Sequence, residues 1–139
     1  EVVLYIYMRH VFQRFSLHTV LVFSVLLTVV RWLCLAYFAE EISMLIFSQL
    51  LHAFSFGAYH AVGFALIRRF FAGGNEGAGM GLYSGVSFGI GGTLGAFLSG
   101  KIWDYSSELS FLLAALMALI ACLIAFFGVR GKLVSALEV

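Results

Sequence analysis

Charged side chains are scarce in this chain of 139 residues, where Asp, Glu, Lys and Arg make up only 11% of the sequence. Soluble domains carry about 25%. Proline is absent and hydrophobic residues reach 63%, with a mean hydropathy of +1.05. The formal net charge of +1 gives no reason to expect nucleic acid as a partner. The composition predicts an integral membrane protein whose helices run without proline breaks.

Metal-ligand clusters and catalytic groupings are also missing. The two cysteines, Cys34 and Cys122, lie deep in separate apolar runs, so we expect two buried small apolar side chains and no metal site. The glycine-rich stretch around Gly89 follows no predicted strand and lacks the lysine of a phosphate-binding loop. No nucleophile–base arrangement is apparent. We therefore expect neither an enzyme nor a cofactor.

The apolar runs are long and do not alternate, which favours helices over the strands of a membrane barrel. A helix needs about 20 apolar residues to cross a bilayer. We expect one all-α domain over residues 1–139, an integral membrane helical bundle of about four full transmembrane helices at residues 17–38, 42–71, 79–103 and 109–128. The opening residues 1–8 are apolar but too short to span. We interpret them as the end of a truncated helix in a piece of a longer protein, or as a short interfacial segment.

Lysine and arginine outside the predicted spans gather on one side of the membrane. If successive helix ends lie on opposite sides of the membrane, Lys101 is alone on one side. The other side then holds Arg9, Arg14, Arg68, Arg69, Arg130 and Lys132. Basic residues favour cytoplasmic loops. We therefore expect a basic loop at 9–14, the glycine-rich loop at 72–79 and the C-terminus to be cytoplasmic, in a bacterial cytoplasmic (inner) membrane.

The predicted span at 42–71 carries a polar stripe. At about 100° per residue, an arc of about 80° holds Gln49, His52, Phe56, His60 and Gly63, with Tyr59 beside it. Hydrocarbon offers polar groups no partners, so such a stripe faces protein or water, and histidine titrates near neutral pH. We expect a substrate or proton path lined by Gln49, His52, Tyr59, His60, Tyr83 and Ser87. The alternative is that each histidine bonds a neighbouring helix and is structural.

Arg31 is an intramembrane charge, roughly 10 Å from the outer end of its predicted span. An arginine at mid-membrane costs about 2.5–3.5 kcal/mol on insertion scales. Either the side chain reaches the outer interface with help from Trp32, or it meets an interior partner such as Gln49 at a matching depth.

The predicted span at 79–103 has small residues at every fourth position. Three such series occur, namely Gly81, Gly85 and Gly89, then Gly91, Gly95 and Ser99, then Gly92, Ala96 and Gly100. Small residues at this spacing let helix backbones approach closely. We expect this helix to pack tightly against its neighbours and to be able to slide or rock.

Taken in order, these residues resemble those of a known family. The chain is similar to the C-terminal half of the major facilitator superfamily, and more narrowly to its phenylpropionate permease and nucleoside–proton symporter-like branch. The similarity lies in the order of these residues along the chain: Arg31, Trp32, Gln49, His52, Phe56, Gly57, His60, Arg69, Tyr83, Ser84, Gly89, Gly92, Gly95, Ser99, Gly100, Trp103 and Asp104. The resemblance implies the end of helix eight and helices nine to twelve of a twelve-helix transporter, which binds solute between two pseudo-symmetric halves.

A second resemblance is to lactose-permease-type symporters, in which an arginine on helix nine and a histidine on helix ten couple transport to protons. Arg31 and His52 are similar to them in placement. That pattern has a carboxylate three residues after the histidine, where this chain has Ser55.

We therefore expect a secondary active transporter of small organic solutes, proton-coupled and working by alternating access. Its other partners are the lipid bilayer and the missing N-terminal half of the same transporter. Two alternatives stay open. One is a small dimeric multidrug exporter, although such exporters usually carry a membrane-embedded carboxylate. The other is a non-transporting membrane scaffold subunit, which the glycine-rich helix would suit.

Overall fold

The computed structural model of the protein describes residues 2–128, with side chains from residue 5 onward. Over this range the chain is helical and contains no strand, which confirms the predicted all-α membrane bundle. The elements in order are α1 (Val2–Arg14), α2 (Leu17–Phe38), α3 (Ile42–Phe70), α4 (Glu76–Ser84), η1 (Gly85–Gly91), α5 (Gly92–Trp103) and α6 (Ser107–Gly128).

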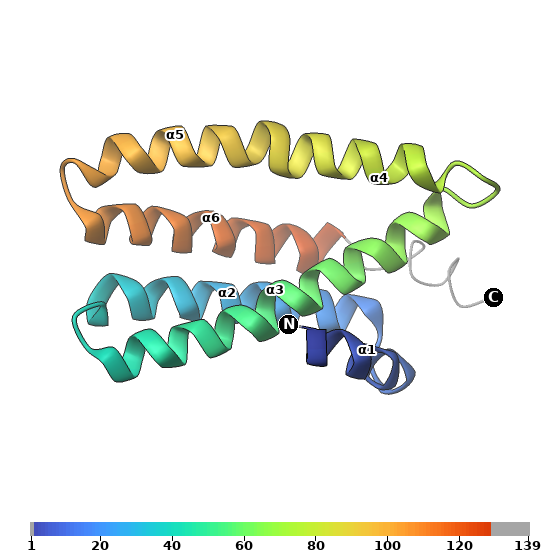
Figure 1. Ribbon diagram of the computed structural model, residues 1–139, viewed down its shortest axis with the longest axis horizontal. Helices are drawn as coiled ribbons and strands as arrows, with labels where there is room; N and C mark the ends of the chain where they lie inside the picture. Colours follow the sequence, from blue (N-terminus) through green and yellow to red (C-terminus); the bar gives the residue numbers. More distant parts are fainter. Residues whose placement is uncertain (1, 129–139) are drawn as a thin grey trace.

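Three of the described helices are long and apolar enough to cross a membrane, namely α2, α3 and α6. A fourth run consists of α4, η1 and α5, which follow one another without a break because Ser84, Gly85, Gly91 and Gly92 all keep right-handed helical dihedrals. Figure 1 shows this run along one edge of the molecule, with α6 and α2 beneath it. Helix α3 packs against α2, crosses the bundle obliquely and leads into α4.

The prediction of a basic loop at residues 9–14 is wrong, because α1 continues as a helix to Arg14. The apolar residues Met8, Val11 and Phe12 recur at helical spacing and pack into a small core with Val20, Ala61 and Val62. Val62 is fully buried, with 0% of its surface exposed. The core therefore extends α1 beyond the point where the basic residues suggested an end, and the basic side chains lie on its outer faces.

The loops and caps explain where the long helices begin. Ser16 caps α2 by accepting a hydrogen bond from the Thr19 amide at 3.1 Å. Between α3 and α4 the chain turns through Gly73 and Gly74, whose φ angles of 85° and 93° suit glycine. Helix α4 then starts at Glu76, three residues earlier than the predicted span.

Helices α2 and α6 pack side by side along much of their length. The buried residues of α6 are small, which lets the two backbones approach: Ser110, Ala115, Cys122 and Ala125. His18 Nε2 on α2 donates to the Phe126 carbonyl at 3.3 Å, and Cys122 Sγ lies 3.9 Å from the Val22 carbonyl oxygen. Cys122 is buried and Cys34 is half-buried, and both are free thiols.

Candidate functional site

The imidazole of His60 is the most enclosed ionisable group of the predicted stripe. It lies on α3 with 7% of its surface exposed. Its Nδ1 donates a hydrogen bond to the Phe56 carbonyl at 3.0 Å, since a carbonyl oxygen can only accept. This bond fixes the ring and leaves Nε2 as the nitrogen available to a ligand or a proton.

Aromatic rings surround His60 on several sides. Phe88 of η1 stacks on it with ring centroids 5.5 Å apart and an interplanar angle of 20°. The other rings have centroids at 4.0 Å for Phe56, 5.5 Å for Tyr59, 6.0 Å for Phe64 and 6.3 Å for Tyr83. The imidazole therefore sits at the junction of α3 with the α4–η1–α5 run, in a setting that favours flat or cationic ligand groups.

The Tyr83 hydroxyl adds a second polar group to this junction. It is buried and has no hydrogen-bond partner of good geometry within the described residues, although the Tyr59 hydroxyl lies close enough for a weak hydrogen bond and Tyr5 acts on it electrostatically. Tyr83 can enter because Gly63 has no side chain: a Cβ there would stand 3.3 Å from the phenol oxygen. A buried hydroxyl with incomplete hydrogen bonding is costly, so a bound polar ligand or a water would stabilise it.

The remaining residues of the predicted path, on α3 and on η1, are less enclosed than His60. His52 is half-buried and packs on Phe56 with ring centroids 5.0 Å apart, so His52, Phe56 and His60 form a line of rings along α3. Gln49 is exposed, one turn beyond His52. Ser87 is half-buried on η1, next to Phe88. The structure thus brings His60, Tyr59 and Tyr83 together and leaves Gln49 at the edge.

Arg31 lies in a different part of the bundle. Its guanidinium sits over the Trp32 ring at 4.1 Å, and that ring stacks on Phe111 of α6 with centroids 5.9 Å apart. Its Nε is buried without a hydrogen-bond partner, and within the described part of the chain no hydrogen bond joins Arg31 to Gln49. The intramembrane charge is therefore held by aromatic packing between α2 and α6.

The small residues of the fourth run lie in open surroundings. A Cβ added at Gly81, Gly85, Gly89, Gly92, Gly95 or Gly100 would meet nothing within 4 Å, and one at Gly91 would meet only the Val86 carbonyl of its own helix. The close approach occurs instead at Gly79, where a Cβ would stand 2.6 Å from the Phe71 ring. At the other end Ser99 Oγ lies 2.8 Å from Ser110 Oγ of α6. The packing role of the other glycines stays a prediction.

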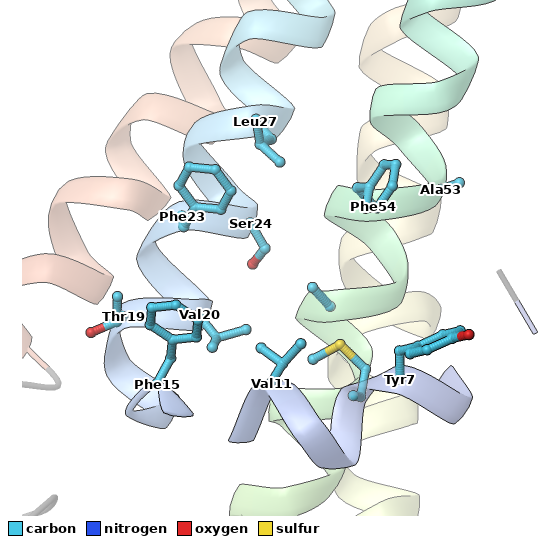
Figure 2. A pocket seen from close by; sticks show the side chains of 12 residues that line it. Tyr7, Val11, Phe15, Thr19, Val20, Phe23, Ser24, Leu27, Ala53 and Phe54 are labelled. Atoms are coloured by element: carbon cyan, nitrogen blue, oxygen red, sulfur yellow. The ribbon is translucent and has the colours of Figure 1, made fainter. Parts of the chain in front are cut away.

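A separate apolar hollow of about 780 Å³ lies between α1, α2 and α3. Figure 2 shows α1 crossing its lower end, with Phe23 on α2 facing Phe54 on α3 above. Ser24 is the polar residue nearest the centre of the hollow in this view, and its hydroxyl donates a hydrogen bond to the Leu21 carbonyl at 2.8 Å. Among the described residues no group of three His, Cys, Asp or Glu could hold a metal ion.

Sequence reasoning missed Phe64 and Phe88 as parts of the His60 environment. Phe64 could have been found, because Phe56, His60 and Phe64 repeat every four residues and so share one face of α3. Phe88 could not, since its place depends on how the fourth run is aligned against α3.

The fold and the site together define a polytopic α-helical membrane protein with a polar and aromatic site between two of its helices. A family model described as the MFS_1 like family matches residues 1–114. The chain therefore belongs to this family and to the major facilitator superfamily, which points to a transporter of the major facilitator type. No curated protein and no solved structure matches the chain.

Proposed function

We propose that the protein is a proton-coupled secondary transporter of small organic solutes that works by alternating access. The observation that carries the proposal is that the buried, ring-fixed imidazole of His60 lies against the Tyr83 ring, whose buried hydroxyl has no partner of good geometry, across the contact between α3 and the fourth run. Secondary transporters bind their solutes at interfaces between packed helical units, near the bilayer midplane.

Each group at this junction has a role in the proposal. His60 Nε2 accepts a proton or a hydrogen bond, and Tyr83 offers its hydroxyl to the solute. The rings of Phe56, Tyr59 and Phe88 give a flat solute faces on which to stack. His52 lies two turns toward the other end of α3 and takes the next position along the path, with Gln49 at its mouth.

The position of the site suits the phenylpropionate permease and nucleoside–proton symporter-like branch, whose solutes carry aromatic rings. In the same proposal the second half of the substrate cavity comes from an N-terminal half of the same transporter. The loop at 71–75 and the C-terminus, which lies outside the described residues, are cytoplasmic, because the basic residues favour that orientation, and the membrane is the bacterial cytoplasmic membrane.

The test uses the full-length protein in liposomes that contain a pH-sensitive dye. Phenylpropionate and a nucleoside serve as the two probe solutes, and the initial rates of solute uptake and proton entry are measured. His60→Ala and Tyr83→Phe are expected to lower both rates strongly, and His52→Ala is expected to lower them as well. Leu50→Ala is the matched control, because Leu50 is an exposed side chain of the same helix.

A further variant separates chemistry from packing. His60→Phe keeps a ring between Phe56 and Phe88 but removes both nitrogens, so it is expected to reach native membrane abundance and still fail to transport. Native transport by His60→Phe would show that the imidazole only fills space, and it would refute the assignment of the site.

A further inference from the structure

The fourth run contains one wide turn, η1. At its start the Gly85 amide bonds the carbonyls of Gly81 and Leu82, four and three residues back, as in an ordinary helix. At its end the Gly92 amide bonds the Ser87 carbonyl, five residues back, in addition to that of Gly89. Such π turns are rare, occur mostly singly within α-helices and hold about one residue more than an α turn.

The wide turn determines which side chains reach α3. Residues five apart on a regular α-helix point about 140° away from each other. Tyr83 and Phe88 are five apart, yet both contact His60, at 6.3 and 5.5 Å between centroids, and they contact each other at 6.1 Å. Both rings can meet one partner because the extra residue brings Phe88 round to the face of Tyr83.

The far end of the same run is attached to a different helix. Ser99 bonds Ser110 at 2.8 Å, and Trp103 meets Phe111 edge-on with centroids 5.5 Å apart. Between the two attachments none of the residues of η1 or α5 is buried. The run is therefore docked at both ends, on α3 and on α6, and unsupported in between.

We propose that η1 stores one residue of helical register, which lets the run dock on α3 and α6 at the same time, and that its relaxation to α-helix releases one of the two ends. Relaxation would rotate α5 by about 100° relative to α4 and move it by about 1.5 Å along the axis. Ser99 would then turn away from Ser110 while Tyr83 stays beside His60. Its use in alternating access rests on the proposed function, whereas the register itself does not.

The test changes the number of residues between the two attachments and measures whether Ser99 still lies opposite Ser110. In the full-length protein with Cys34 and Cys122 replaced by alanine, Ser99→Cys and Ser110→Cys are expected to form a disulfide on mild oxidation in membranes. Deleting Ile90 removes one residue from the wide turn, so the run becomes a regular α-helix in which Tyr83 and Ser99 keep their native register. Phe88 then turns away from His60, but Tyr83 stays on α3 and Ser99 stays opposite Ser110, so the cross-linking yield stays unchanged. In a run that was α-helical throughout, the same deletion would rotate Ser99 by about 100° and abolish the cross-link.

Two further length variants complete the design. Deleting Gly92 instead of Ile90 is expected to preserve the cross-link equally, because either deletion removes one residue between the attachments. Inserting an alanine after Ile90 is expected to abolish it. Loss of the cross-link in both deletions, failure of both to accumulate in the membrane, or an insertion that still cross-links would each overturn the stored register.

Transport gives a separate measurement. The Ile90 deletion lacks the extra residue whose relaxation would release one end, and it also turns Phe88 away from His60. It is therefore expected to cross-link fully and to transport neither phenylpropionate nor a nucleoside. Native transport by the deletion would overturn the releasing role of η1. If the native-length protein transports neither probe, the proposed function is what fails, and the cross-linking pattern still decides the register.

Discussion

A methyl group added at Gly79 is expected to destabilise the α3–α4 junction. The new Cβ would stand 2.6 Å from two carbons of the Phe71 ring and 3.0 Å from Ile67 Cγ2. Ile67 lies in the last turn of the long helix that carries His60, and Phe71 is the residue that caps this helix. Forcing an extra carbon into a packed site costs about 1–3 kcal/mol. Alanine recovers up to about 1 kcal/mol, because it favours the helix more than glycine does.

Gly81 provides the matched control. Only Met80 separates it from Gly79, and both glycines belong to α4. A Cβ at Gly81 meets nothing within 4 Å, so Gly81→Ala is expected to be neutral or stabilising by up to about 1 kcal/mol. The helix-propensity gain is common to both variants. Their difference, about 1–3 kcal/mol, therefore isolates the clash with Phe71.

The assay is unfolding by denaturing detergent in mixed micelles, followed through the fluorescence of Trp32 and Trp103. Gly79→Ala should unfold at lower denaturant than Gly81→Ala, with an unchanged slope. Equal midpoints for the two variants would refute the close packing of Gly79 on Phe71. A destabilised Gly81→Ala would show that another element covers the open face of the fourth run in the full protein.

Two further predictions concern topology and the far end of the run. Cysteines placed at Asn75 and at Glu41 should label from opposite faces of the membrane, because the two loops lie at opposite ends of α3; labelling from one face would contradict the expected topology. Ser110→Ala removes the partner of Ser99 and is expected to cost about 0.6 kcal/mol of unfolding free energy, typical of hydrogen bonds between membrane helices. Ser107→Ala, at an exposed position of the same helix, serves as its control, and equal losses in both would contradict the role of the Ser99–Ser110 contact.

Much of the fold could be predicted from composition and run length alone. Long apolar runs without proline can satisfy their backbone in a membrane only as helices, so the spans of α2, α3 and α6 follow closely from the sequence. The first helix could not be bounded in this way. Arg9 and Arg14 suggested a loop, but Met8 and Val11 give α1 an apolar face that only the packed core reveals.

The candidate site was predictable where it rests on one helix. His52 and His60 fall on one line along α3, and the rings between and beyond them follow from regular helical spacing. What encloses His60 from outside α3 was not predictable. A single helix shows which side chains share a face, but it does not show which residues of a partner helix arrive opposite.

The wide turn explains why the residue beside Tyr83 in the site differs from the one that regular helical spacing predicts. A constant step of about 100° per residue puts Tyr83 and Ser87 on one face and sends Phe88 elsewhere. In the structure it is Phe88 that joins Tyr83 against His60, because η1 inserts about one residue into the turn between them. The same extra residue rotates every position after Gly85 relative to α4. Residues of α5 therefore share faces with one another as expected, but not with the residues of α4. A helix rich in glycine accepts such a turn readily, and the register of α5 against α6 then depends on η1 as much as on the sequence of α5 itself.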